Sequence, residues 1–158
     1  NDEECRWIAY GDSVVFHYNR HTELLEHSFT RLADFSNPPR LVSCKDPLEE
    51  EGCCSGVFHI DDASIVFAAS DALSHYVLMM YELSKSAEFE SELMELRMKR
   101  TSNSQLLQMA EKEVFKFYDD VLSPLLRSVD SEANFKELME SLYVKKLIDI
   151  DDYTLAIL

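Results

Sequence analysis

The sequence has no long apolar run and no opening signal segment. No stretch approaches the ~20 consecutive apolar residues that a membrane-spanning helix requires, and the first residues are acidic and polar, unlike a secretory signal. Basic residues are also scarce, because 15 lysines and arginines stand against 30 acidic residues and leave a net charge of −15. This charge repels phosphate backbones, so we expect no nucleic-acid partner. The lack of a long apolar run predicts no membrane partner either. It is compatible with a solvated acidic surface, with metal cations or with basic partner surfaces.

Motifs typical of zinc sites are absent as well. The four cysteines include the neighbours Cys53 and Cys54 but no Cys-x-x-Cys pair, and none of the five histidines falls in a His-Glu-x-x-His or comparable motif. Adjacent cysteines rarely bridge each other, so we expect reduced thiols in an intracellular, cytoplasmic protein. We interpret the histidines as surface or partly buried residues.

The chain is long enough for one domain, which we place over residues 1–158, with a hydrophobic content of 46% that is typical of a globular core. Two β-prone runs around Gly11-Asp12, at 5–10 and 13–18, predict a hairpin. A second hairpin is predicted from 55–60 and 64–69, and the latter run is apolar throughout, as in a strand buried on both faces. The residues between predict an irregular stretch at 19–40, a short strand at 41–43 and an exposed loop at 44–55.

The period of the apolar residues changes to a helical one from Asp71. The next segment predicts a helix that ends near Met98, and an apolar stripe over 107–121 predicts another that ends or kinks near Pro124. A capping box at Asn134 and Glu137 predicts an amphipathic helix behind it. A last strand is predicted from about Tyr153. The order of strands, helices and strand predicts an α+β fold, with layered antiparallel β-sheet and packed helices.

Four acidic residues lie at the ends of predicted strands: Asp12, Asp71, Asp151 and Asp152. Carboxylates held by a rigid strand suit hard divalent cations such as Mg²⁺ and Mn²⁺, because these ions require oxygen ligands in fixed geometry. Each residue also has an ordinary explanation. Asp12, Asp151 and Asp152 suit turns, and Asp71 suits the start of a helix.

Together, and in this order, these positions resemble a known family. The motifs are Gly11-Asp12-Ser13, Phe67-Ala68-Ala69-Ser70-Asp71-Ala72-Leu73 and Asp151-Asp152-Tyr153-Thr154-Leu155, with Phe35-Ser36-Asn37-Pro38-Pro39 as a further match. They resemble the second half of the metal-dependent, type-2C class of protein phosphatases, in its bacterial-style branch. The resemblance covers roughly residues 5–158, and residues 84–130 match only as a helical insertion or flanking helices.

The resemblance implies part of an αββα sandwich that binds two Mn²⁺ or Mg²⁺ ions and hydrolyses phosphoserine or phosphothreonine in a phosphoprotein substrate. By the same resemblance, Asp71 and Asp151 are metal ligands, and Asp12 and Asp152 are accessory acidic residues close to the metals.

The chain departs from the family pattern at several positions. No Asp-Gly dipeptide occurs, Ala72 stands where the family has glycine, and Ser70 stands where threonine or cysteine is usual. Nothing matches the family's first half, so we expect an absent N-terminal half of the same domain to complete the site, and no activity from this chain alone. Two alternatives stay open: a catalytically degenerate phosphatase-like domain that acts as a regulatory or protein-binding module, and an unrelated acidic α+β binding module.

Overall fold

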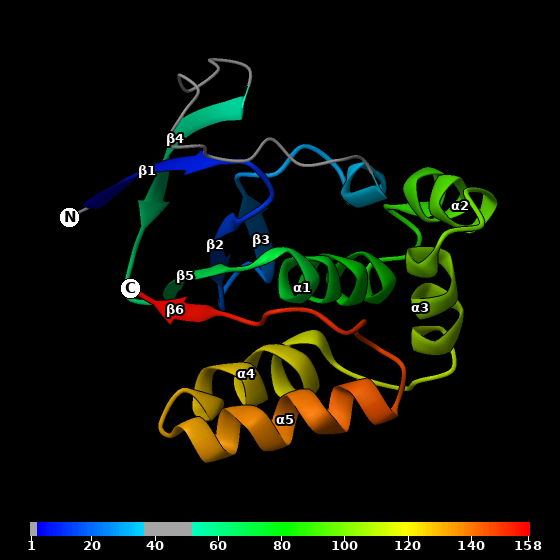
Figure 1. Cartoon of the computed structure of the whole chain (residues 1–158). Helices are drawn as coiled ribbons and strands as arrows, with labels where there is room; N and C mark the ends of the chain where they lie inside the picture. Colours follow the sequence, from blue (N-terminus) through cyan, green and yellow to red (C-terminus); the bar gives the residue numbers. More distant parts are fainter. Residues whose placement is uncertain (1–2, 37–51) are drawn as a thin grey trace, which may run out of the picture.

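The computed structural model describes residues 3–36 and 52–158 (Figure 1). Its strands are β1 (Glu3–Tyr10), β2 (Val14–Asn19), β3 (Leu24–His27), β4 (Cys53–Ile60), β5 (Ser64–Ala69) and β6 (Leu155–Ile157). Its helices are α1 (Asp71–Ser84), α2 (Glu90–Met98), α3 (Ser102–Ala110), α4 (Ser123–Ser128) and α5 (Glu132–Val144), with a 3₁₀ helix at Leu32–Ser36 and a π-helix at Phe117–Leu122. The predicted α+β class is confirmed.

The strands form two antiparallel sheets. One has four strands in the order β3-β2-β5-β6, and the other consists of β1 and β4 alone. The strands predicted within the described residues are present, but both predicted hairpin pairings are wrong. β1 pairs with β4 rather than β2, and β5 pairs with β2 and β6 rather than β4. A turn dipeptide fixes only where the chain reverses, whereas the partner of each strand is chosen by long-range packing.

The middle of the four-stranded sheet is formed by β2 and β5, because both carry large apolar residues. Val14, Phe16 and Tyr18 of β2 are buried, as are Val66 and Phe67 of β5. Phe16 lies opposite Phe67 in the ladder, and their rings stack with centroids 4.8 Å apart. Such an aromatic pair adds ~0.5–1.5 kcal/mol beyond the burial of its area. This pairing sets the register of β5, and therefore the position at which the chain leaves the sheet for α1.

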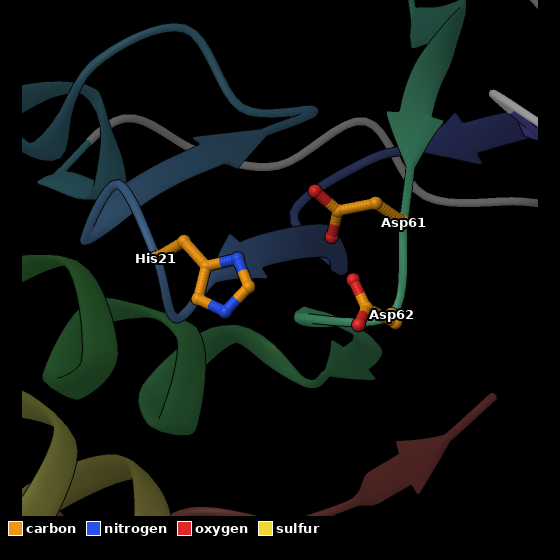
Figure 2. Close-up of side chains that lie close together, drawn as sticks. All are labelled: His21, Asp61 and Asp62. Carbon is orange, nitrogen blue, oxygen red and sulfur yellow. The ribbon is translucent and has the colours of Figure 1, made fainter.

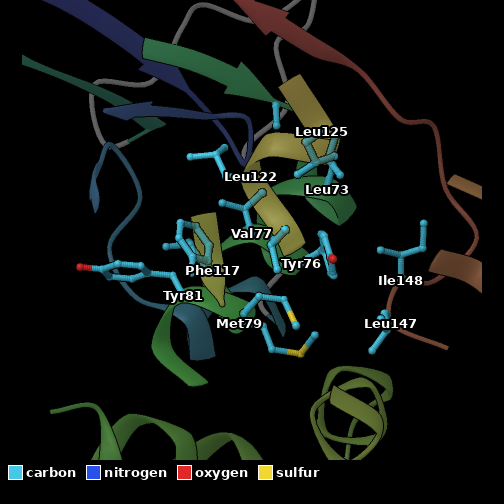
Figure 3. Packing of buried hydrophobic residues seen from close by; sticks show 14 of the residues in the cluster. Leu73, Tyr76, Val77, Met79, Tyr81, Phe117, Leu122, Leu125, Leu147 and Ile148 are labelled. Carbon is cyan, nitrogen blue, oxygen red and sulfur yellow. The ribbon is translucent and has the colours of Figure 1, made fainter. Parts of the chain in front are cut away.

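The central helix of the fold is α1, since ten of its residues are buried. In Figure 3 its residues Leu73 and Val77 lie beside Leu122 and Leu125, and the π-helix packs against α1. Tyr81 meets the Phe117 ring edge-on, with centroids 5.2 Å apart. Residues of the range 84–130 also join this core, including Leu93, Leu96, Leu107 and Leu122.

The second half of the helical region differs from the predicted pattern. The expected stripe over 107–121 is divided, because α3 ends at Ala110 and the π-helix begins only at Phe117. Pro124 lies at the start of α4, directly after the π-helix ends at Leu122, so the helix changes from π to α near Pro124, where an end or kink was predicted. The cap of α5 is Ser131, whose Oγ accepts from the Asn134 N–H, so the predicted capping box at Asn134 and Glu137 was placed one turn late.

Two further sequence predictions meet the structure only in part. The predicted irregular stretch at 19–40 contains β3 and the 3₁₀ helix, and the predicted loop at 44–55 contains the start of β4. The predicted strand at 41–43 lies outside the described residues.

Cys5, Cys53 and Cys54 are free thiols. Among the helices that the structure describes, none has the length and apolar character needed to cross a bilayer.

Candidate functional site

Asp71 lies where the sheet passes directly into the central helix. β5 ends at Ala69, Ser70 has extended backbone angles (φ −70°, ψ 166°), and Asp71 is the first residue of α1. Its carboxylate is half-buried. The buried strand therefore delivers this side chain to a fixed point at the start of a helix, where the N-terminal dipole favours negative charge.

Ser70 ties the segment around Asp151 to this point. Its Oγ donates to the Asp152 carbonyl at 2.9 Å and accepts from the Thr154 N–H at 3.0 Å, while its own N–H donates to the Thr154 carbonyl at 3.1 Å. The ladder continues beyond these contacts, because Ala69 pairs with Leu155 of β6. Asp152 thus contributes through its backbone, and its side chain is exposed.

Asp71 and Asp151 line one cavity with a volume of about 370 Å³. Asp149, which the sequence analysis did not single out, contributes a third carboxylate. The other described residues of the lining are Phe35, Ala72, His75, Thr101, Ser102, Asn103, Leu106 and Ile150. No lysine or arginine belongs to this described lining, so no basic side chain among the described lining residues offsets the charge of the three carboxylates.

The pKa of Asp71 depends on two of the other predicted acidic residues. Burial first, and then the negative charges of Asp12 and Asp151, raise the pKa of this carboxyl from 3.8 to about 6. Asp12 lies in the turn after β1, next to Gly11, whose φ of 77° is the left-handed conformation that favours glycine. The structure therefore brings Asp12 and Asp151 into electrostatic range of Asp71, and Asp152 is not among the causes of this shift.

Two polar residues of the cavity were missed in the sequence. The His75 side chain is buried, with 3% of the residue exposed, and its Nε2 has no hydrogen-bond partner among the described residues. The buried Oγ1 of Thr101 also lacks a partner there. Burial lowers the pKa of His75 to about 4, so its imidazole is neutral near pH 7. The one signal available was spacing, since residues four apart share a helix face and His75 follows Asp71 by one turn.

The donor atoms of these residues are ones that divalent cations bind. Carboxylate oxygens are the ligands that Mg²⁺ and Mn²⁺ prefer, and a neutral imidazole nitrogen binds transition metals. The ligand atoms around Asp71 are not closely clustered. Within the described ranges, the one set of three His, Cys, Asp or Glu ligand atoms lying within 4.8 Å of one another is elsewhere, at His21, Asp61 and Asp62. A cation at Asp71 and Asp151 would therefore keep part of its water shell, as Mg²⁺ commonly does.

The His21, Asp61 and Asp62 cluster is exposed and lies on two turns of the sheets (Figure 2). Asp61 already has a structural role. Its Oδ1 accepts from the Ala63 N–H at 2.9 Å and from the Asn19 Nδ2 at 3.0 Å. The Asn19 hydrogen bond is the largest cause that lowers the pKa of Asp61, followed by the Ala63 N–H. These contacts explain the carboxylate as part of the turn between β4 and β5.

Comparison with models of protein families, with curated proteins and with solved structures found no match for this chain. The resemblance to type-2C phosphatases accordingly depends on the sequence motifs alone.

Proposed function

We propose that the cavity at Asp71 and Asp151 binds Mn²⁺ or Mg²⁺, and that the chain supplies this part of a site that hydrolyses phosphoserine or phosphothreonine. The observation that supports the proposal is the concentration of negative charge. Three carboxylates line the cavity, and the pKa of Asp71 is raised by burial and by Asp12 and Asp151. Like charges held together in a partly buried site are stabilised when a cation binds between them.

Four residues near the cavity have defined parts in this proposal. Asp71 offers a carboxylate fixed by the junction of β5 and α1, and Ser70 holds the backbone that carries Asp151. Asp12 adds negative charge, which raises the pKa of Asp71 and which a bound cation would offset. A bound divalent ion supplies the chemistry of the reaction, because it lowers the pKa of a coordinated water and polarises phosphoryl oxygens.

A second candidate function is a cation-dependent binding module without catalysis. The observation that favours it is the lack of lysine and arginine among the described lining residues, since a phosphate ester needs a positive group to hold it. The absence of an Asp-Gly dipeptide favours it as well. Both candidates require the same cation at Asp71 and Asp151, and they differ in whether a phosphoryl group is turned over.

Calorimetric titration of the purified chain with MnCl₂ tests the shared step. We expect Asp71→Asn and Asp151→Asn to weaken Mn²⁺ binding by at least about tenfold, the lower end of what loss of a supporting group at a metal site costs. Asp62→Asn is the matched control, because it removes a carboxylate from the exposed His21 cluster, and it should bind as the wild type does. Binding lost in Asp62→Asn and kept in Asp71→Asn would refute the proposal.

Hydrolysis of a phosphothreonine peptide by the full-length gene product, with and without Mn²⁺, separates the two candidates. Turnover that requires Mn²⁺ and is lost in Asp71→Asn supports the phosphatase. Mn²⁺ binding at Asp71 without any turnover supports the binding module instead.

A further inference from the structure

The buried imidazole of His75 has no explanation as a core residue. A buried nitrogen without a hydrogen-bond partner costs ~1–3 kcal/mol, and most buried polar groups avoid this cost. The Nε2 of His75 lacks a partner among the described residues although only 3% of the residue is exposed. Phe35 packs its ring edge-on against the imidazole at 5.6 Å between centroids, which restrains the ring without satisfying its nitrogen.

The position of His75 relates this nitrogen to the carboxylates. His75 follows Asp71 by four residues in α1, so both side chains lie on one face of the helix, and both line the same cavity. Thr101, whose Oγ1 is also buried and without a partner among the described residues, lines this cavity too. Two of the five buried side-chain atoms without a partner among the described residues therefore belong to residues that line the cavity of the predicted metal ligands.

We propose that His75 is a nitrogen ligand of the cation that binds at Asp71, and that it makes the site prefer Mn²⁺, Co²⁺ or Zn²⁺ to Mg²⁺. The inference rests on the proposed cation binding and adds to it the selectivity of the ion. Mg²⁺ takes oxygen ligands and gains little from an imidazole, whereas imidazole is a good ligand for the later divalent ions of the first transition series. A ligand set of carboxylates alone would give a weaker preference.

Pulsed electron paramagnetic resonance of the Mn²⁺-loaded chain tests the proposal directly, because a coordinated imidazole nitrogen modulates the electron spin echo. We expect this nitrogen modulation in the wild type and its loss in His75→Gln. His59→Gln, at an exposed position of β4, and His21→Gln, in the exposed cluster, are matched controls that should keep it. Calorimetry should show at least about tenfold weaker Mn²⁺ binding in His75→Gln, with Mg²⁺ binding changed by less than about twofold.

The possible failures are distinct. Nitrogen modulation that persists in His75→Gln, while Asp71→Asn still weakens Mn²⁺ binding, overturns the role of His75 alone. Modulation that disappears in His21→Gln places the ion at the exposed cluster and overturns the proposed function as well. A wild-type chain that binds no Mn²⁺ overturns both this inference and the proposed function. Should His75→Gln fail to fold, titration of the wild type decides the matter. Mn²⁺ must then broaden the ring resonances of His75 before those of His21 and His59, and a different order of broadening overturns the proposal.

Discussion

Replacing Asp71 with asparagine should stabilise the protein near neutral pH when no cation is present. Burial, with Asp12 and Asp151, raises the pKa of the carboxyl from 3.8 to about 6. Each pKa unit corresponds to about 1.4 kcal/mol, but solvent screens a half-buried carboxylate, so its charge costs roughly 1–2 kcal/mol in the folded state. The helix N-terminus favours the charge by only ~0.3–1 kcal/mol. The net gain expected for Asp71→Asn at pH 7 is therefore about 1 kcal/mol.

The sign of the pH dependence follows from the direction of this shift. The folded state keeps its proton up to pH 6 or so, whereas the unfolded chain releases it near pH 3.8. Because the folded state binds more protons between these values, the contribution of Asp71 to the free energy of unfolding falls as pH rises through this window. The penalty is complete at pH 7 and absent below pH 3.8, so the advantage of Asp71→Asn should vanish near pH 4 (about the lower pKa).

Urea unfolding followed by circular dichroism, at pH 7 and at pH 4 in a chelating buffer, measures this difference. Added Mn²⁺ should reverse the order, since a ligand at 100 times its Kd stabilises the wild type by about 2.7 kcal/mol. Asp62→Asn, at an exposed turn, should change little. A variant at Asp71 that is less stable than the wild type at pH 7 without cation, or whose difference is equal at both pH values, would refute the reasoning.

Two further changes test the core and the link between Ser70 and the last strand. Burial and then Glu92 raise the pKa of Glu82 to about 8, so unfolding free energy should fall as pH rises from 4.5 to 8, and Glu82→Gln should flatten this slope in thermal melts. An unchanged slope would contradict the assignment. Ser70→Ala loses two side-chain hydrogen bonds, so it should lower the free energy of unfolding by ~1–3 kcal/mol and weaken Mn²⁺ binding. The control Ser84→Ala loses one hydrogen bond to the Tyr81 carbonyl and should leave Mn²⁺ binding unchanged. Equal Mn²⁺ affinity in Ser70→Ala and wild type would show that Ser70 does not position Asp151.

The sequence predicted the local elements better than their assembly. The strands around Phe16 and Phe67 and the helix from Asp71 were predictable because their apolar residues repeat at the period of the structure they form. β3 was missed since it has four residues, too few for a visible period, and only its position beside β2 makes it a strand. The assignment of β1 and β2 to different sheets depends on packing between distant segments, which the turn at Gly11 does not encode.

In the candidate site, too, some residues could be predicted from the sequence and others could not. Asp71 and Asp151 could be predicted to lie together because strand ends hold side chains in fixed places, and both line one cavity. His75 and Thr101 could not be selected in this way. What distinguishes them is an unsatisfied atom in a buried position, and burial is a property of the folded chain rather than of the residue type.

The register of β6 determines whether the carboxylate of Asp151 can serve the cavity at all. Only Leu155, Ala156 and Ile157 pair with β5, and the Leu158 N–H adds a bond to the Val66 carbonyl. A slip of two residues would keep the same side chains facing inward, yet it would carry Asp151 about 7 Å along the strand and out of reach. If the proposed site binds its cation, a peptide that competes for this edge of β5 should weaken that binding without touching a ligand. Cation affinity would then measure how well the last strand is seated.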